Sequence, residues 1–353
     1  MTLEDLKQYA PYIDQHIEKV LCDFADEVQP EADDEQAVWA LSIIREYALR
    51  SGKRLRGALA ACLYDVRTGQ KYAEAGLSLA AVIELIHDYL LILDDVMDRS
   101  ATRRGLPTVH EQYKRQFSHI GANEFEADMM AVNVGLLVQH IASWALSRMD
   151  VNTKIVQQIM HRNIGITGFG QMADVAGTIT RPTTSEQIIK KYYKKSSIYT
   201  FVNPLFCALA LAGDTDETAQ QQVEAFGLPA GLAFQLRDDW LGIFGSPEES
   251  GKSNLDDIHE GKNTFLVQET LERCTEGHKK TLLEIIGNEQ ATVDDLSAVK
   301  EVMTQTGAVE TAQALMEQAG REACEAARVS SLWAGDFADL LQQVVQYSME
   351  RIK

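Results

Sequence analysis

The sequence predicts an all-α fold made of one large helical domain over residues 1–353. The chain has only seven prolines, so long stretches lack the residue that breaks helices. Within these stretches apolar residues recur at spacings of three and four, as in residues 79–86 and 137–145. Alternating apolar and polar runs, which would predict strands, are scarce. No internal repeat or long linker divides the chain.

In the first half of the chain, the pattern predicts one especially apolar helix. This helix ends at Asp94 and Asp95. The residues that precede these two aspartates are nearly all apolar, so we expect the helix to be buried. A loop over roughly residues 99–108 follows it.

In the second half, capping residues mark where helices begin. Thr184 is followed three residues later by Gln187, a capping box that predicts a helix start. We expect that helical stretch to kink or break at Pro204 and to end at Gly213. Thr292 predicts another helix start, because two aspartates follow it closely. A second loop is expected over roughly residues 245–261.

The charge balance limits the possible partners of the chain. It carries 33 basic and 52 acidic residues, a formal net charge of −19. Binding to nucleic acid or to an anionic membrane surface needs an excess of Lys and Arg, so we expect neither. An anionic small substrate would need a local basic patch or bound cations.

The cysteines and the N-terminus indicate a cytoplasmic protein. Five scattered cysteines without a CxxC pair fit neither a zinc site nor a disulfide framework, and they suit a reducing compartment. The first fifteen residues are acidic and lack the apolar core of a signal peptide. No apolar run approaches the ~20 residues that span a bilayer, so we expect no membrane span.

The first segment that carries chemistry is the end of the buried helix. Asp94 and Asp98 are four residues apart and share one helical face. Buried carboxylates must be paired, protonated or metal-bound, and oxygen ligands suit Mg²⁺, which also binds substrate phosphates. Arg103 and Arg104 follow, and guanidinium groups match phosphate oxygens. The alternative is a helix end with exposed acids and a salt-bridged basic turn.

A second segment further along the chain repeats this design. Asp238 and Asp239 end an apolar helix, and the glycine-flanked lysines Lys252 and Lys262 lie in the loop after it. The second pattern alone would be weak, and its weight comes from the repetition. Two such segments imply two half-sites that converge on one cavity. Mg²⁺ ions there would neutralise one diphosphate, and separate basic residues would hold a second.

These motifs together resemble those of the trans-isoprenyl diphosphate synthases, also called polyprenyl synthetases. The resemblance runs from Gly52 to Thr264 and keeps the family's order of motifs. The matching motifs are Gly52-Lys53-Arg54-Leu55-Arg56, Asp94-Asp95-Val96-Met97-Asp98, Gly170-Gln171-Met172-Ala173-Asp174, Lys195-Ser196 and Asp238-Asp239-Trp240-Leu241-Gly242. There are two departures. Gly242 replaces the third aspartate of many members, for which we expect little loss, and Ser196 replaces a threonine with an equivalent hydroxyl.

The resemblance implies a helical bundle of the isoprenoid synthase type around a central cavity, with three Mg²⁺ per active site. An allylic diphosphate ionises there, isopentenyl diphosphate attacks the cation, and the departing pyrophosphate takes the proton.

The metal ligands that the resemblance implies are Asp94, Asp98 and Asp238, with Asp95, Asp174 and Asp239 as weaker candidates. For the allylic diphosphate it implies Arg103, Lys195 and Lys252, with Lys262 as a further candidate that could equally be a surface lysine. For isopentenyl diphosphate, which binds without metal, it implies Gly52, Lys53, Arg56, His87 and Arg104. The supporting polar residues it implies are Gln171, Asp174, Ser196 and Gln235, of which Ser196 and Gln235 join Lys195 as candidate catalytic residues.

Product length is expected to depend on the helix that ends in Asp94. Tyr89 lies five residues before Asp94, about 7.5 Å back along the axis at ~1.5 Å per residue. Its ring would form a floor for the growing chain, while Leu90 leaves more room than a second aromatic residue would. This pattern resembles geranylgeranyl diphosphate synthases more than farnesyl ones, which favours a twenty-carbon product over a fifteen-carbon one. The alternative is that Tyr89 is ordinary core and the floor lies on another helix.

Two rival functions stay open at this point. A class I terpene synthase of the same fold would cyclise or hydrolyse rather than elongate, and it would not need the second diphosphate site at Lys53, Arg56 and Arg104. A catalytically inactive regulatory subunit would have lost acids or arginines, which both motifs retain. A homodimer is what the resemblance implies.

Lys195 belongs to a run of lysines along the chain. We interpret its neighbours in this run as a solvated helix face, namely Lys190, Lys191 and Lys194.

Overall fold

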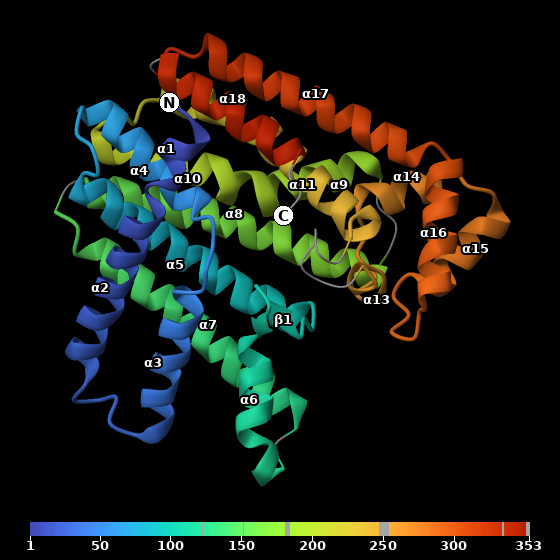
Figure 1. The fold of residues 1–353 in the computed structure, drawn as a ribbon, viewed down its shortest axis with the longest axis horizontal. Helices are drawn as coiled ribbons and strands as arrows, with labels where there is room; N and C mark the ends of the chain where they lie inside the picture. Colours follow the sequence, from blue (N-terminus) through green and yellow to red (C-terminus); the bar gives the residue numbers. More distant parts are fainter. Residues whose placement is uncertain (122, 151, 181–183, 247–253, 334, 351–353) are drawn as a thin grey trace. The chain divides into compact units, whose positions relative to one another are not determined.

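The structure, a computed structural model, describes residues 1–121, 123–150, 152–180, 184–246, 254–333 and 335–350 (Figure 1). Its regular structure is almost entirely helical, which confirms the predicted all-α class. Two compact units are distinguishable. The first unit comprises residues 2–159 and 204–215, and the second unit comprises residue 1 with residues 160–203 and 216–353. The expectation of a single domain over residues 1–353 stays a prediction.

The first unit is organised around one buried helix, α5. Its elements are α1 (Leu3–Lys7), α2 (Ala10–Val28), α3 (Glu35–Ala48), α4 (Leu55–Thr68), α5 (Glu74–Met97), β1 (Thr102–Arg103), β2 (Leu106–Pro107), α6 (Val109–Phe117), the 3₁₀ turn η1 (Ser118–Ile120), α7 (Glu124–Ser147), the start of α8 (Thr153–Thr180) and most of α10 (Asn203–Ala212). Helix α5 packs against α2, α4 and α7 (Figure 1). Leu79, Val82, Ile83 and Leu85 on it are almost completely buried, as the apolar periodicity predicts. Each such side chain contributes roughly 1.5–3 kcal/mol by leaving water.

By length and composition alone, two described helices, α5 and α7, could cross a membrane. Most of the apolar window of α5 is buried inside the protein. Core helices of soluble proteins pass the same test, so this finding is weak evidence for a membrane span.

A short hairpin interrupts the loop expected over residues 99–108. Strands β1 and β2 pair antiparallel, Thr102 with Pro107 and Arg103 with Leu106. The two turn residues, Arg104 and Gly105, have φ values of 55° and 75°. Two consecutive left-handed residues make the turn that matches the twist of a tight hairpin. This turn fixes where the arginines after the first acidic motif point.

The second unit is built on α11. Its elements are the rest of α8, α9 (Ser185–Tyr192), the π-helix η2 (Tyr193–Val202), α11 (Glu217–Phe244), α13 (Asp256–His259), α14 (Phe265–Arg273), α15 (Glu276–Ile285), α16 (Val293–Gln305), α17 (Ala308–Val329) and α18 (Gly335–Glu350). Helix α11 packs against η2, α17 and α18 (Figure 1). The capping boxes predicted at Thr184 and Thr292 are present.

The predicted interruption near Pro204 takes the form of a change in helix type. Residues 193–202 wind as a π-helix, and α10 begins at Asn203. Pro204 therefore lies at the junction of the two helix types, where the Asn203 N–H still donates to the Ile198 carbonyl and Pro204 has no N–H to donate. Helix α10 ends at Ala212, and Gly213 follows with a φ of 101°, as predicted for this helix end.

Candidate functional site

The acids of the first motif point in two directions from the end of α5. Asp95 is 1% exposed and accepts hydrogen bonds from Arg103 Nε (2.8 Å) and from the Tyr47 hydroxyl (3.1 Å). Burial, the largest cause, raises the pKa of Asp95, and Arg103 opposes the rise. Asp94 is partly exposed, and Asp98 lies one turn later on the same face. Asp94 and Asp98 can therefore offer oxygens to a ligand, whereas Asp95 is held by the protein.

The hairpin that carries Arg103 and Arg104 is fixed from beneath by Arg50. This buried guanidinium donates to the backbone carbonyls of Pro107 (2.8 Å) and Arg103 (3.3 Å) and pairs with Glu46 (2.8 Å). Arg103 also approaches Asp94, with Nη2 3.8 Å from Oδ2. Arg50 precedes the motif that begins at Gly52 and carries no sequence signal of its own, so the sequence reasoning missed it.

The predicted isopentenyl diphosphate residues of the first unit lie near one another. The Arg104 guanidinium packs against Gly52, where a Cβ would lie 3.2 Å from Arg104 Cζ. Arg56 Nη1 lies 3.4 Å from His87 Nε2. Burial first, and then Arg56 and Arg104, lower the pKa of His87 well below its ordinary value, so His87 is a neutral ring. Lys53 is exposed. The arrangement offers several side-chain cations that could bind a diphosphate without the help of a metal ion.

Two buried acids lie beneath these cations. Glu84 accepts a hydrogen bond from the Gly57 N–H (2.8 Å) and lies 3.7 Å from Arg54. Asp88 is 1% exposed, and no described residue donates a hydrogen bond to it. Arg104 Nη2 lies 4.0 Å from its carboxylate. Burial, opposed by Arg104, raises the pKa of Asp88 to about 8.

The proposed floor residues lie on α5, before the acids. Tyr89 and Leu90 are both partly buried, and burial raises the pKa of Tyr89. Their placement on α5 agrees with the expected helix, while their role in product length stays a prediction.

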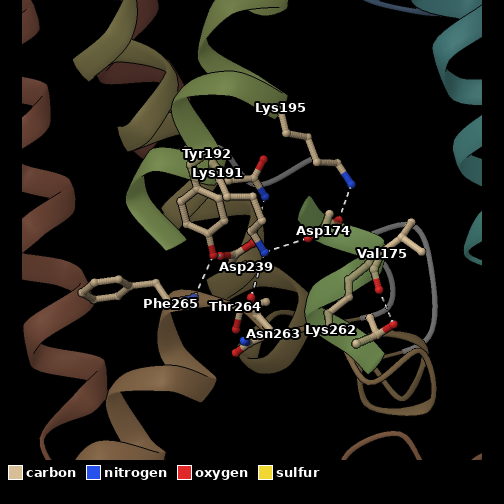
Figure 2. Close-up of polar contacts among 12 residues, drawn as sticks. Asp174, Val175, Lys191, Tyr192, Lys195, Asp239, Lys262, Asn263, Thr264 and Phe265 are labelled. Carbon is tan, nitrogen blue, oxygen red and sulfur yellow. Dashed lines mark hydrogen bonds and ion pairs between the residues drawn. The ribbon is translucent and has the colours of Figure 1, made fainter. Parts of the chain in front are cut away.

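The second motif on α11 repeats the division between outward and inward acids. Asp238 is exposed, whereas Asp239 is buried and accepts hydrogen bonds from the Tyr192 hydroxyl and from Gln235 Nε2 (2.8 Å). Figure 2 shows that Tyr192 also accepts the Phe265 N–H through its hydroxyl (2.7 Å). Burial raises the pKa of Asp239 to about 7. Asp239, like Asp95, is thus held by the protein, and Asp238 is the outward acid.

A carboxylate shared by two lysines lies beside the second motif (Figure 2). Asp174 on α8 accepts from Lys191 Nζ through Oδ1 (2.7 Å) and from Lys195 Nζ through Oδ2. Lys191 also donates to the Asn263 carbonyl (2.8 Å). Burial alone would raise the pKa of Asp174, but the two ammonium groups hold it far below its ordinary value. Gly170 is required here, because a Cβ on it would lie 2.4 Å from the Lys195 backbone nitrogen.

The structure corrects one interpretation of the lysine run. Lys191 is not part of a solvated face, since it is only 6% exposed and bonded to Asp174 and Asn263. Lys190 and Lys194 are exposed, as expected. Lys191 lies between Ile188 and Tyr192 on the buried side of α9, and this position could have revealed it.

The remaining predicted residues of the second unit are placed as follows. The Ser196 hydroxyl donates to Gln235 Oε1, so these two candidates touch each other. Gln171 is partly exposed on α8. Lys262 is paired with Glu260 and lies 3.7 Å from Asp257. Lys252 lies outside the described residues.

The donor set of both units fits a hard divalent cation. Asp94, Asp98 and Asp238 offer carboxylate oxygens at the surface of their units, and such oxygens are the ligands that Mg²⁺ prefers. Among the described residues, no group of three or more Asp, Glu, His or Cys could hold a metal together.

Comparisons with known proteins show which family the chain resembles. A family model described as polyprenyl synthetase matches residues 38–303. A geranylgeranyl diphosphate synthase of Saccharolobus solfataricus is 33% identical over 258 residues, covering 71% of this chain and 72% of that protein. A farnesyl pyrophosphate synthase of Saccharomyces cerevisiae is 29% identical over 265 residues, covering 72% and 68%. The solved geranylgeranyl pyrophosphate synthase of Corynebacterium glutamicum, complexed with isoprenyl diphosphate and magnesium, is 24% identical, with a TM-score of 0.88 over 98% of this chain and 99% of that one.

Proposed function

Because this chain belongs to the polyprenyl synthetase family, we propose that it uses Mg²⁺ to condense isopentenyl diphosphate with an allylic diphosphate, giving mainly a twenty-carbon product. The chain is a prenyltransferase of the short-chain trans-isoprenyl diphosphate synthase type, and its substrates are isoprenyl diphosphates. The finer assignments of metal, residue roles and product length form the proposal.

One observation supports the metal assignment most directly. At both motifs the protein holds the second acid with its own hydrogen bonds, Asp95 with Arg103 and Asp239 with Tyr192. The first acids lie closer to solvent, since Asp94 is partly exposed and Asp238 is exposed. Buried, satisfied neighbours fix the helix ends, so the outward carboxylates are in place before a cation binds.

The residues of the chain have separate tasks in the reaction. Asp94, Asp98 and Asp238 would hold Mg²⁺, which when bound offsets the charge of the departing pyrophosphate. Lys195 presents its ammonium group to the allylic diphosphate, and Arg103 its guanidinium. Ser196 and Gln235 orient each other beside this group. Arg56 and Arg104 bind isopentenyl diphosphate, and neutral His87 can accept a hydrogen bond from Arg56.

Product length is the finer part of the proposal. Relatives carry geranylgeranyl, farnesyl and geranylfarnesyl names, so a fifteen-carbon product is the second candidate. The pair Tyr89 and Leu90 before the first motif favours twenty carbons, because one ring leaves a deeper cavity than two would. A terpene synthase is disfavoured, because the cations around Arg104 form a second diphosphate site that such an enzyme does not need.

Assembly and location are also proposals. We propose a homodimer in the cytoplasm. The five cysteines all lie in the described part of the chain and form no disulfide with one another there, which suits a reducing compartment. Phe125 and Leu136 on α7 are large apolar side chains exposed on the single chain, and a second copy could cover them.

Incubation of the purified chain with Mg²⁺, isopentenyl diphosphate and farnesyl diphosphate tests the function. A twenty-carbon diphosphate, identified by mass, is the expected product. If the chain elongates only primers shorter than farnesyl diphosphate, and its products end at fifteen carbons, it is a farnesyl diphosphate synthase instead. Cyclised or hydrolysed farnesyl diphosphate without elongation would contradict the proposal.

A further inference from the structure

The carboxyl group of Asp88 is buried in the first unit without a hydrogen bond. The residue lies on α5 and is 1% exposed. Among the described residues, none donates a hydrogen bond to either of its oxygens. Burying a carboxylate without such partners is costly, so its presence on an otherwise apolar stretch of helix calls for an explanation.

The Arg104 guanidinium lies between this carboxyl group and solvent. Arg104 Nη2 is 4.0 Å from Asp88 Oδ1, which is too far for a hydrogen bond. Arg104 Nη1 donates to the Arg50 carbonyl (3.3 Å), and the guanidinium packs against Gly52. The Arg104 side chain is 22% exposed. A guanidinium carries five N–H donors, so Arg104 can turn some of them toward Asp88 or toward an anion at the surface.

Asp88 can change its charge just above neutral pH. The charged and titratable groups around it are Tyr47 and Arg50 at the end of α3, Arg54 with its partner Asp14 before α4, Glu84 and His87 on α5, and Arg104 in the hairpin turn. Burial is the largest influence on the pKa of Asp88 and raises it to about 8, against the effect of Arg104. Burial also holds the pKa of Tyr47 well above its ordinary value and that of His87 well below, so both stay neutral near pH 8.

We propose that Asp88 competes with isopentenyl diphosphate for Arg104, so that Asp88 takes up a proton from solvent when the diphosphate binds. The inference rests on the proposed function, in which Arg104 binds this diphosphate. An ionised Asp88 draws the guanidinium inward and repels the ligand through its like charge. A protonated Asp88 leaves Arg104 to the diphosphate, with which a guanidinium forms charge-assisted hydrogen bonds. Asp88 is thus a positioning residue that acts through Arg104.

Calorimetric titration of the full chain with isopentenyl diphosphate tests this without turnover, since neither Mg²⁺ nor an allylic substrate is present. Titrations at pH 8.5 in two buffers with different ionisation enthalpies give the number of protons taken up. A nearby like charge raises the pKa of a carboxyl group by one unit or more, so wild type should take up about half a proton for each diphosphate bound.

Asp88→Asn keeps the shape of the protonated side chain and cannot ionise. Its proton uptake should be close to zero. The wild-type Kd divided by the Kd of Asp88→Asn should rise at least about fivefold between pH 7 and pH 9, because one unit of pKa is a tenfold effect and the titration of the ligand cancels in this ratio. Glu74→Gln is the matched control, because it removes an exposed acid from the first turn of the same helix and should behave as wild type does.

The outcomes separate this inference from the function on which it rests. Absence of proton uptake by wild type would overturn the inference without any variant, and so would equal uptake by wild type and Asp88→Asn. Arg104→Gln should weaken isopentenyl diphosphate at pH 7. If it does so while Asp88→Asn keeps the wild-type pH dependence, the inference alone fails. If Arg104→Gln binds the diphosphate as wild type does, the role of Arg104 in the proposed function fails as well.

Discussion

Lys191 offers the sharpest test of how the second half-site is held together. The substitution Lys191→Met keeps most of the side-chain volume but removes the ammonium group. Asp174 would keep Lys195 and lose the partner of its other oxygen, and the Asn263 carbonyl would lose its donor. Breaking a buried ion pair on one side costs about 3–5 kcal/mol, and the remaining lysine reduces this to about 2–4 kcal/mol.

This loss should appear in thermal unfolding. A cost of about 2–4 kcal/mol corresponds to a Tm roughly 5–15 °C lower for a unit of this size. Lys190→Met is the matched control, since Lys190 pairs with Glu186 on the exposed face of the same helix. Such exposed pairs contribute about 0.3–0.5 kcal/mol, so its Tm should change by about 2 °C or less.

The pH dependence gives a second readout of the same pair. The lysines hold the pKa of Asp174 below the ordinary value of 3.8, so its ionised form stabilises the fold above that pH. The stability gap between wild type and Lys191→Met should therefore narrow as the pH falls below 3.8 toward the lowered pKa of Asp174. Equal Tm losses for the two lysine variants, or a gap independent of pH, would refute the reasoning.

Four further predictions concern the two acidic motifs and the residues around the first one. Asp94→Ala or Asp238→Ala should abolish turnover by removing metal ligands, and near-normal rates in Mg²⁺ for either would contradict that role. Arg56→Ala should raise KM for isopentenyl diphosphate far more than KM for the allylic partner, and an unchanged KM would argue against it. Tyr89→Ala should shift the products to longer chains, as measured by mass spectrometry. A product distribution like that of wild type would mean that another residue forms the floor. Asp88→Asn should raise Tm more at pH 9 than at pH 5. Burial raises the pKa of Asp88 from 3.8 to about 8, so the native state loses stability as pH rises between these values; equal gains at both pH values would contradict this.

The helical elements were predictable because their signals are local. The apolar run of α5 and the capping box at Thr184 act within a few residues, and the structure contains both features. The hairpin at Thr102–Pro107 was not predictable from alternation, since its strands have two residues each. The π-helix was missed for a similar reason, because its extra width depends on packing and not on a sequence period.

The candidate site was predictable where a motif carried it and hidden where a long-range contact did. The outward placement of Asp94 and the inward placement of Asp95 follow from helix geometry once one face is buried. The partners of the inward acids, Tyr47 and Tyr192, come from distant segments that no local pattern joins to the motifs.

The π-helix η2 also has a consequence for how relatives are aligned. It contains Lys195, whose ammonium group binds Asp174, and its backbone lies against Gly170. A π-helical turn closes five residues along, so it holds more residues per turn than an α-helix does. A relative that winds this segment as an ordinary α-helix would need a one-residue deletion to keep its lysine facing α8. Gaps in an alignment within residues 193–202 would then record helix type rather than loss of function, and a deletion engineered there should turn Lys195 away from Asp174.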